Sequence, residues 1–322
     1  WQYLSSSKEI TYDENGENPV TNITEYVYEN PDHSFLTKVI RTTSKGEVSE
    51  ERIRYVDDYN NELQNFPLLK EKHIVNTPIK TEQLVDDILV SGRIITLNDN
   101  GRIKDLYVYE SEVAESVPHD PGILLPAQYK WKSTFTYDAN QNLHAVNTRE
   151  GIRKDYIWGY DGVYPIAEII QSTVDHAAFT SFESEGTGNW TVPSSVRSNI
   201  SYTGSQSYSL SSGAISTSVD NTKRYLISFW AHTSSNVTVN GNTPQAAETI
   251  NGWTFYNTIV SGTSTVSIAG SGTIDEVRLC NINPKITTYT YSPGMGVNSI
   301  TDPNGKTTFF NYDTFGRLKR IE

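Results

Sequence analysis

Short runs of hydrophobic and β-branched residues alternate with turn-forming residues along this chain. Near the C-terminal end, the runs cover residues 286–291, 297–301, 306–312 and 317–321. They are separated by Ser292-Pro-Gly, Asp302-Pro-Asn-Gly and Asp313-Thr-Phe-Gly. Short apolar runs bounded by Gly, Pro, Asn and Asp are typical of β-strands joined by tight turns. The pattern therefore predicts a succession of β-hairpins.

The strand-and-turn unit repeats. Tyr291 and Tyr312 lie 21 positions apart, and a period of this length indicates a stacked array, because a single hairpin cannot bury its apolar face alone. Degenerate copies occur earlier, at Tyr12-Asp13-Glu-Asn-Gly16, Leu97-Asn-Asp-Asn-Gly101 and Tyr137-Asp138-Ala-Asn-Gln141. In the last copy Gln141 replaces the glycine, and we expect Asn140 or Asn142 to take the left-handed conformation instead.

Three stretches between the copies are less regular. Residues 57–67 and 116–122 are polar or rich in proline and are predicted to be loops. Residues 81–89 fit a short helix and a strand followed by a loop equally well.

Residues 181–280 contain only ten charged side chains and are rich in Ser, Thr, Gly and Asn. Short alternating runs with turn signals about every ten residues are typical of a β-sandwich. We therefore predict an all-β protein with three parts. They are hairpin repeats over residues 1–175, an inserted sandwich over 176–283, and resumed repeats over 284–322.

Composition narrows the class of protein. The net charge of −12 and the pI near 5.0 argue against a nucleic-acid partner, which requires clustered Lys and Arg. The single cysteine, Cys280, rules out an intrachain disulfide. No run of apolar residues is long enough to predict a membrane span. The composition suits an exported bacterial protein, and because the sequence opens on Trp1 we expect it to be a fragment of a longer repeat protein.

Catalytic motifs are not found. The sequence contains no His-Glu-x-x-His, no Gly-x-Ser-x-Gly and no glycine-rich phosphate loop. Adjacent acidic pairs such as Asp57-Asp58 face opposite sides of a strand, which makes them poor glycosidase pairs. We expect a non-enzymatic protein. A polysaccharide hydrolase with two carboxylates from distant positions is the alternative that remains open.

The repeated unit resembles a known family. Tyr312-Asp313-x-x-Gly316-Arg317-Leu318, preceded by Asp302-Pro-Asn-Gly305, resembles the YD repeat of the Rhs family. The segment Trp158-Gly-Tyr160, followed by Tyr164-Pro-Ile, is similar to the Bacteroidetes type of these proteins. The resemblance implies stacked hairpins that form a curved sheet and contact neighbouring repeats, in a secreted or cell-surface bacterial protein.

The predicted insertion resembles a carbohydrate-binding module of the jelly-roll kind. The resemblance is carried, in order, by Phe179-Thr-Ser-Phe-Glu183, Gly204-Ser-Gln-Ser-Tyr-Ser-Leu210, Tyr225-Leu-Ile-Ser-Phe-Trp-Ala231, Gly252-Trp-Thr-Phe-Tyr256 and Ile274-Asp-Glu-Val-Arg-Leu279. It implies that the insertion binds a carbohydrate. An architectural insertion without any ligand is the other reading that remains open.

Two sets of site residues follow. Strand alternation predicts that Asp275 shares an inward face with Val277 and Leu279, while Glu276 and Arg278 point outward. In the resembling modules, acidic residues at the positions of Glu183 and Asp275 hold a structural Ca²⁺, and carboxylate oxygens suit that cation. The alternative is that Asp275 accepts backbone N–H groups without a metal.

The candidate sugar-binding residues are Trp190, Trp230, Trp253 and Tyr256, which supply aromatic faces.

Overall fold

The computed structural model describes residues 2–42, 46–60, 64–111, 122–283 and 285–322. The chain forms two compact units, residues 1–135 and 136–322. Both consist mainly of antiparallel β-strands, which confirms the predicted all-β class. None of the helices in the described residues has the length and apolar character that crossing a bilayer requires.

The first unit is an antiparallel sheet whose strands follow one another in chain order. Its strands are β1 (Ser6–Thr11), β2 (Val20–Val27), β3 (Lys38–Thr42), β4 (Val48–Arg54), β5 (Lys80–Val85), β6 (Ile88–Leu97), β7 (Ile103–Tyr109) and β8 (Tyr129–Tyr137). A short helix, α1 (Phe66–Glu71), and the 3-10 turn η1 (Val56–Asp58) lie between β4 and β5.

The helix packs on this sheet through a buried apolar cluster. Its members are Val56, Tyr59, Phe66, Leu69, Ile79, Ile94, Leu97, Leu124 and Tyr129. The predicted loop at 57–67 therefore contains a helix start, which begins at Phe66 and has proline at its first turn. Residues 81–89 are strand rather than helix, because Asp86 and Asp87 take positive φ and close a hairpin between β5 and β6. Residues 116–121 of the other predicted loop lie outside the described residues.

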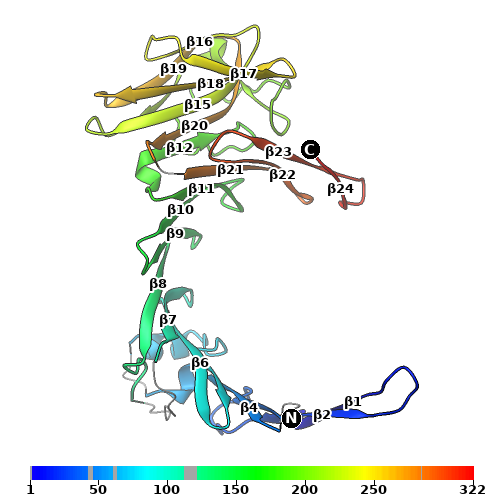
Figure 1. Ribbon diagram of the computed structural model, residues 1–322. Helices are drawn as coiled ribbons and strands as arrows, with labels where there is room; N and C mark the ends of the chain where they lie inside the picture. Colours follow the sequence, from blue (N-terminus) through cyan, green and yellow to red (C-terminus); the bar gives the residue numbers. More distant parts are fainter. Residues whose placement is uncertain (1, 43–45, 61–63, 112–121, 284) are drawn as a thin grey trace. The chain divides into compact units, whose positions relative to one another are not determined.

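The second unit contains a sheet that the chain leaves and rejoins. It comprises β9 (Leu143–Thr148), β10 (Arg153–Gly159), β11 (Tyr164–Ile170), β21 (Lys285–Ser292), β22 (Gly296–Thr301), β23 (Thr307–Tyr312) and β24 (Leu318–Ile321). Strand β11 pairs directly with β21, with Ile169 opposite Ile286. Figure 1 shows the two strands side by side, so the sheet is continuous across the intervening residues.

Residues 177–281, called the two-sheet region below, lie between β11 and β21. The first sheet contains β12 (Ala177–Thr180), β13 (Tyr208–Ser209), β15 (Arg224–His232), β17 (Gln245–Ile250), β18 (Trp253–Ser261) and β20 (Thr273–Asn281). The second contains β14 (Ile215–Ser218), β16 (Asn236–Val239) and β19 (Thr265–Ser271). The 3-10 turns η2 (Val174–His176) and η3 (Leu210–Ser212) precede β12 and β14.

Both sheets of this region contribute to one core, called the inner core. Its buried members are Ala178, Phe182, Trp190, Tyr208, Leu210, Ile215, Tyr225, Ile227, Phe229, Ala231, Val237, Val239, Val266, Ile268, Ile274, Val277 and Leu279. A second cluster joins the two-sheet region to the flanking strands. It contains Ile157, Ile166, Ala167, Ile169, Ala177, Phe179, Cys280 and Ile286. Cys280 is thus a buried apolar residue, and burial raises the pKa of its thiol to about 11.

One turn geometry recurs between successive strands. In the turn that starts at Asp313, a carboxylate oxygen accepts the N–H groups of Phe315 and Arg317 at 2.9 and 3.0 Å. The N–H of Gly316 donates to the carbonyl of Asp313, and Gly316 has φ +75°. The same pair of side-chain bonds is made by Asp13, Asn98, Asp138 and Asp302. Five pairs of strands are therefore joined by turns in which the first residue's side chain accepts two backbone N–H groups and the fourth residue is left-handed.

The turn after β8 corrects one sequence expectation. Gln141 itself takes the left-handed conformation, with φ +64°, and neither Asn140 nor Asn142 has positive φ. The position within the turn therefore decides which residue is left-handed, although Asn usually tolerates this conformation better. Thr148 and Gly151 form a turn with similar backbone bonds and a left-handed glycine but without the side-chain acceptor, and the sequence reading missed it.

We expect the cost of replacing a turn glycine to depend on its surroundings. Gly305 and Gly316 both have positive φ, but only at Gly305 would a Cβ atom lie 2.8 Å from Phe255 Cζ. Gly316→Ala should lower the free energy of unfolding by about 1 kcal/mol through backbone strain alone. Gly305→Ala should cost about 1–3 kcal/mol more, because the turn must also move away from the aromatic ring. Urea denaturation measures both, and equal losses would contradict this expectation.

Candidate functional site

The four aromatic residues predicted to bind a glycan do not share one open surface. Trp190 is 2% exposed and belongs to the inner core. Trp230 and Trp253 are 1% and 4% exposed and lie together in another cluster. Tyr256 is partly buried and stacks on Phe229 at 5.6 Å. Glycan binding at these residues stays a prediction, and of the four only Tyr256 keeps appreciable exposure.

The chain's own flanking strands cover the cluster around Trp230. The cluster contains Trp230, Trp253 and Phe255 with Tyr202 against them. The Tyr202 ring stacks on Trp230 at 3.8 Å and meets the edge of Phe309, on β23, at 5.8 Å. The turn glycine Gly305 approaches Phe255 from the same direction. From Ile227 to Ala231, both faces of β15 are therefore buried, one in the inner core and one beneath the flanking strands, whereas Leu226 is exposed.

A β-bulge in β20 overturns the predicted orientation of Asp275. The pairing of β15 with β20 shifts between Ser228 and Trp230, so Asp275 lies opposite Trp230, and Glu276 takes φ +50°. Opposite residues of an antiparallel pair share a face. Asp275 therefore lies on the Trp230 face and not with Val277 in the inner core. Strict alternation failed because the bulge inserts one extra residue.

Asp275 and Glu183 hold the two halves of one loop. Asp275 Oδ2 accepts the N–H groups of Tyr202 and Thr203 at 2.8 and 2.9 Å. Glu183 Oε1 accepts the N–H groups of Ser205 and Gln206 at 2.8 and 2.5 Å. Burial raises the pKa of both carboxyls, and for Asp275 the neighbouring Glu276 adds to the effect. The loop at residues 202–206 thus depends on two carboxylates.

The arrangement of these carboxylates does not fit a calcium site. A cation needs free oxygen lone pairs directed at one point, whereas here N–H groups point at the oxygens of Asp275 and Glu183. No group of three or more His, Cys, Asp or Glu side chains within the described residues is arranged to hold a metal ion. The contacts match the metal-free alternative, in which Asp275 accepts backbone N–H groups. Calcium binding itself stays a prediction.

Glu276 and Arg278 point away from the inner core, yet they are only 1% and 3% exposed. Glu276 accepts hydroxyl hydrogen bonds from Thr203 at 2.9 Å and from Thr288, on β21, at 3.1 Å. Arg278 donates to Ser228 Oγ at 3.2 Å and to the carbonyl of Asp302 at 2.8 Å. Two buried ionisable groups of β20 are therefore bonded to the flanking strands. Their outward orientation was predicted, but their burial was not.

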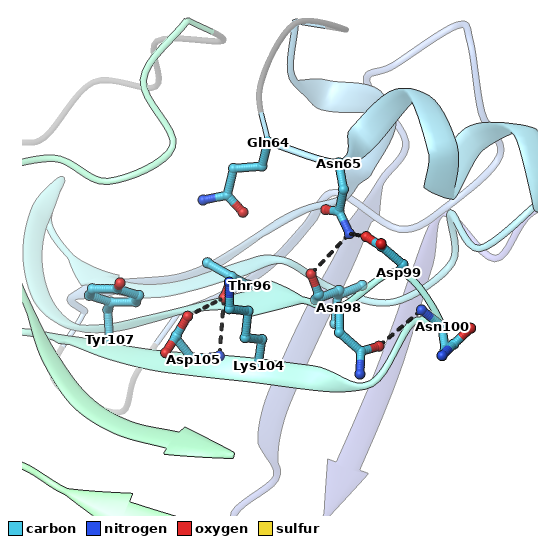
Figure 2. A pocket seen from close by; sticks show the side chains of 10 residues that line it. Gln64, Asn65, Thr96, Asn98, Asp99, Asn100, Lys104, Asp105 and Tyr107 are labelled. Carbon is cyan, nitrogen blue, oxygen red and sulfur yellow. Dashed lines mark hydrogen bonds between the residues drawn. The ribbon is translucent and has the colours of Figure 1, made fainter. Parts of the chain in front are cut away.

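A separate, largely polar pocket of 810 Å³ lies in the first unit. Figure 2 shows Gln64 and Asn65 near the start of α1 on one side, with Thr96, Lys104, Asp105 and Tyr107 of β6 and β7 opposite. The turn residues Asn98, Asp99 and Asn100 close one end. Asn65 Nδ2 donates to the Leu97 carbonyl at 3.1 Å and to Asp99 Oδ1 at 2.9 Å.

The sequence reading singled out none of the pocket's side chains as a site. The turn at Asn98 was recognised as a repeat element, but α1 was not expected, so nothing indicated that Gln64 and Asn65 would face it. The one available signal was a local concentration of amides and carboxylates in Asn98-Asp99-Asn100.

Comparison with known proteins yields distant structural similarity only. No known protein family matches the chain, and no curated protein matches it. The crystal structure of TcdB2-TccC3-Cdc42 is similar at 10% identity and a TM-score of 0.21. That of TcdB2-TccC3 is similar at 11% identity and the same TM-score. The alignments cover 95% and 98% of this chain but only 16% of the other chains.

We expect Asp275→Asn to destabilise the protein strongly. The substitution places an NH₂ group where one carboxylate oxygen now accepts a backbone N–H, and it leaves a fully buried donor unpaired. The free energy of unfolding should fall by about 2–4 kcal/mol, as measured by urea denaturation. Glu248→Gln, on the exposed strand β17, is the matched control and should change it by less than about 0.5 kcal/mol. A near-neutral Asp275→Asn would show that the loop does not depend on this carboxylate.

A calcium titration checks the metal prediction directly. Because N–H groups already occupy the carboxylate oxygens, we expect about 1 mM Ca²⁺ or excess EDTA to move the Tm by less than about 1 °C. An increase of several degrees with Ca²⁺, abolished in Glu183→Gln, would instead establish an ion at these residues.

Proposed function

We propose that this chain is a non-catalytic, structural segment of a bacterial Rhs or YD-repeat protein, secreted or located at the cell surface. Its hairpins form an antiparallel sheet, called the wall below, that continues through neighbouring repeats. The two-sheet region, which we interpret as a jelly-roll insertion, packs against this sheet and stabilises it. For this region, the proposal favours the architectural alternative over the reading in which the insertion binds a glycan.

The observation that carries the proposal is the buried junction between the insertion and the strands on either side of it. Glu276 and Arg278 of the insertion bond to β21 and to the Asp302 turn while almost fully buried. A buried charge that loses its partners is strongly destabilising. The insertion therefore cannot leave the wall without exposing the Trp230 cluster and unpairing these groups.

The recurring turn supports the repeat assignment. Tyr12-Asp13, Tyr137-Asp138 and Tyr312-Asp313 each place an aspartate at the first turn position, where its carboxylate accepts two backbone N–H groups. The Tyr-Asp pair thus has a physical role in the hairpin, because the Asp fixes the turn that ends one strand and begins the next.

The carboxylates described above also favour a non-catalytic role. Asp275 and Glu183 accept backbone N–H groups, and Glu276 accepts hydroxyl hydrogen bonds inside the junction. A glycosidase needs two carboxyl groups that face a shared substrate cleft. These three face the protein's own loop and strands, which leaves the hydrolase alternative without a candidate pair among them.

The proposal is tested by asking whether the insertion and the wall unfold together. Arg197 lies in the two-sheet region, where its guanidinium group packs over the rings of Phe182 and Tyr208 at 5.6 and 5.9 Å. We expect Arg197→Ala to lower the free energy of opening by the same amount for amides of β15 and of β22, about 1–2 kcal/mol. Native-state hydrogen exchange with mass spectrometry measures both.

The matched control is Arg320→Ala on β24, where the arginine side chain is 70% exposed. It should leave β15 and β22 unchanged within about 0.5 kcal/mol. If Arg197→Ala weakens β15 while β22 keeps its protection, the insertion is an independent module and the proposed role is wrong.

A further inference from the structure

The pocket between α1 and strands β6 and β7 is lined by polar side chains whose orientation is fixed by hydrogen bonds. The amide of Asn65 has a defined orientation, because Nδ2 donates to both the Leu97 carbonyl and Asp99 Oδ1. Its Oδ1 atom is buried and accepts no hydrogen bond within the described residues. Figure 2 shows this oxygen on the side of Gln64, away from Asp99. With less than 1 Å² of accessible surface, this oxygen lies beneath the pocket surface, so a ligand would contact the exposed polar groups around it.

The opposite wall supplies a fixed carboxylate beside an aromatic ring. Asp105 Oδ2 accepts the Thr96 hydroxyl at 3.0 Å, and Oδ1 accepts the Thr134 hydroxyl at 2.5 Å. An ionised carboxylate has about four acceptor positions, so Asp105 remains able to bind a ligand hydroxyl. Tyr107 follows two residues later on the same strand and is half-buried in the pocket wall. A carboxylate beside an aromatic face combines hydrogen bonding with apolar contact.

The pocket also contains donors. Asn98 uses its Oδ1 atom to accept the N–H groups of Asn100 and Arg102, both at 3.0 Å, so its NH₂ group remains a donor. Lys104 and Gln64 are exposed at the pocket edge, and neither side chain makes a hydrogen bond in the described part of the chain. Both donors and acceptors therefore line this cavity.

We propose that this pocket binds a neutral oligosaccharide. Sugar hydroxyls donate and accept at once, which matches the mixed lining of amides, carboxylates and one ammonium group. The face of a sugar ring is apolar enough to pack against Tyr107. A volume of 810 Å³ lies within the range of ligand pockets and exceeds the needs of a single small ion.

Other ligand classes fit less well. Two carboxylates, Asp99 and Asp105, outnumber the one ammonium group of Lys104, which disfavours a phosphate or another anion. No group of three or more His, Cys, Asp or Glu side chains in the part of the chain that the structure describes is placed to hold a metal ion, which disfavours a tightly held cation. The mostly polar lining disfavours an apolar ligand. This inference does not depend on the structural role proposed above.

The test is isothermal titration calorimetry of the 322-residue chain with cellotetraose, maltotetraose, mannotetraose and chitotetraose, each up to about 10 mM. We expect at least one of them to bind. Lys104→Ala and Gln64→Ala, both exposed and therefore tolerated by the fold, should each weaken that affinity at least about tenfold. Lys8→Ala, an equally exposed lysine on β1, is the matched control and should leave the affinity unchanged.

Three outcomes would overturn the inference. In one, none of the four oligosaccharides binds. In another, an oligosaccharide binds with the same affinity to the Lys104→Ala and Gln64→Ala variants. If Tyr256→Ala alone abolishes that binding, the ligand belongs to the two-sheet region and not to this pocket.

Discussion

A side-chain oxygen that accepts two backbone N–H groups joins five pairs of successive strands in this protein. In the Asp313 turn, the carboxylate holds the N–H groups two and four residues later, and Gly316 reverses the chain with positive φ. The bonds fix the number of residues in the turn between two paired strands. The turn length sets the pairing register of the strands, which decides the face on which each side chain lies. Stacking of hairpins with short connections depends on this local geometry, which Asp13 and Asp302 reproduce far apart in the sequence.

The junction with the two-sheet region depends on the same turns. The Asp302 carbonyl accepts a hydrogen bond from Arg278, and Gly305 in the same turn lies against Phe255. A side chain at position 305 would separate these surfaces. The bulge at Glu276 serves the junction as well, because it brings Asp275 and Glu276 to the outer side of β20, where they bind the 202–206 loop and β21. Local backbone irregularities thus position the buried polar groups.

Sequence reasoning succeeded where the determinants are local. Asp313-Thr-Phe-Gly316 predicts a turn because each residue acts within four positions of the others. It failed where the determinant is tertiary. The alternation rule misplaced Asp275, since a bulge is decided by pairing with β15, about fifty residues earlier in the chain. It also gave no reason to expect that the outer face around Trp230 is covered by strands that follow the two-sheet region. The polar pocket was not predictable, because Asn65 and Asp105 come together only when α1 packs on the sheet.

The repeated turn also explains why a polar pocket can form at one hairpin without loss of the turn. Among the five side-chain acceptors, Asn98 is the one amide, and the other four are aspartates. An amide oxygen accepts the same two N–H groups as a carboxylate, so the hairpin is kept. The NH₂ group that accompanies it carries no charge and adds donors to the pocket wall. At this hairpin the amide therefore keeps the turn and also supplies uncharged donors to the cavity that α1 forms with the sheet.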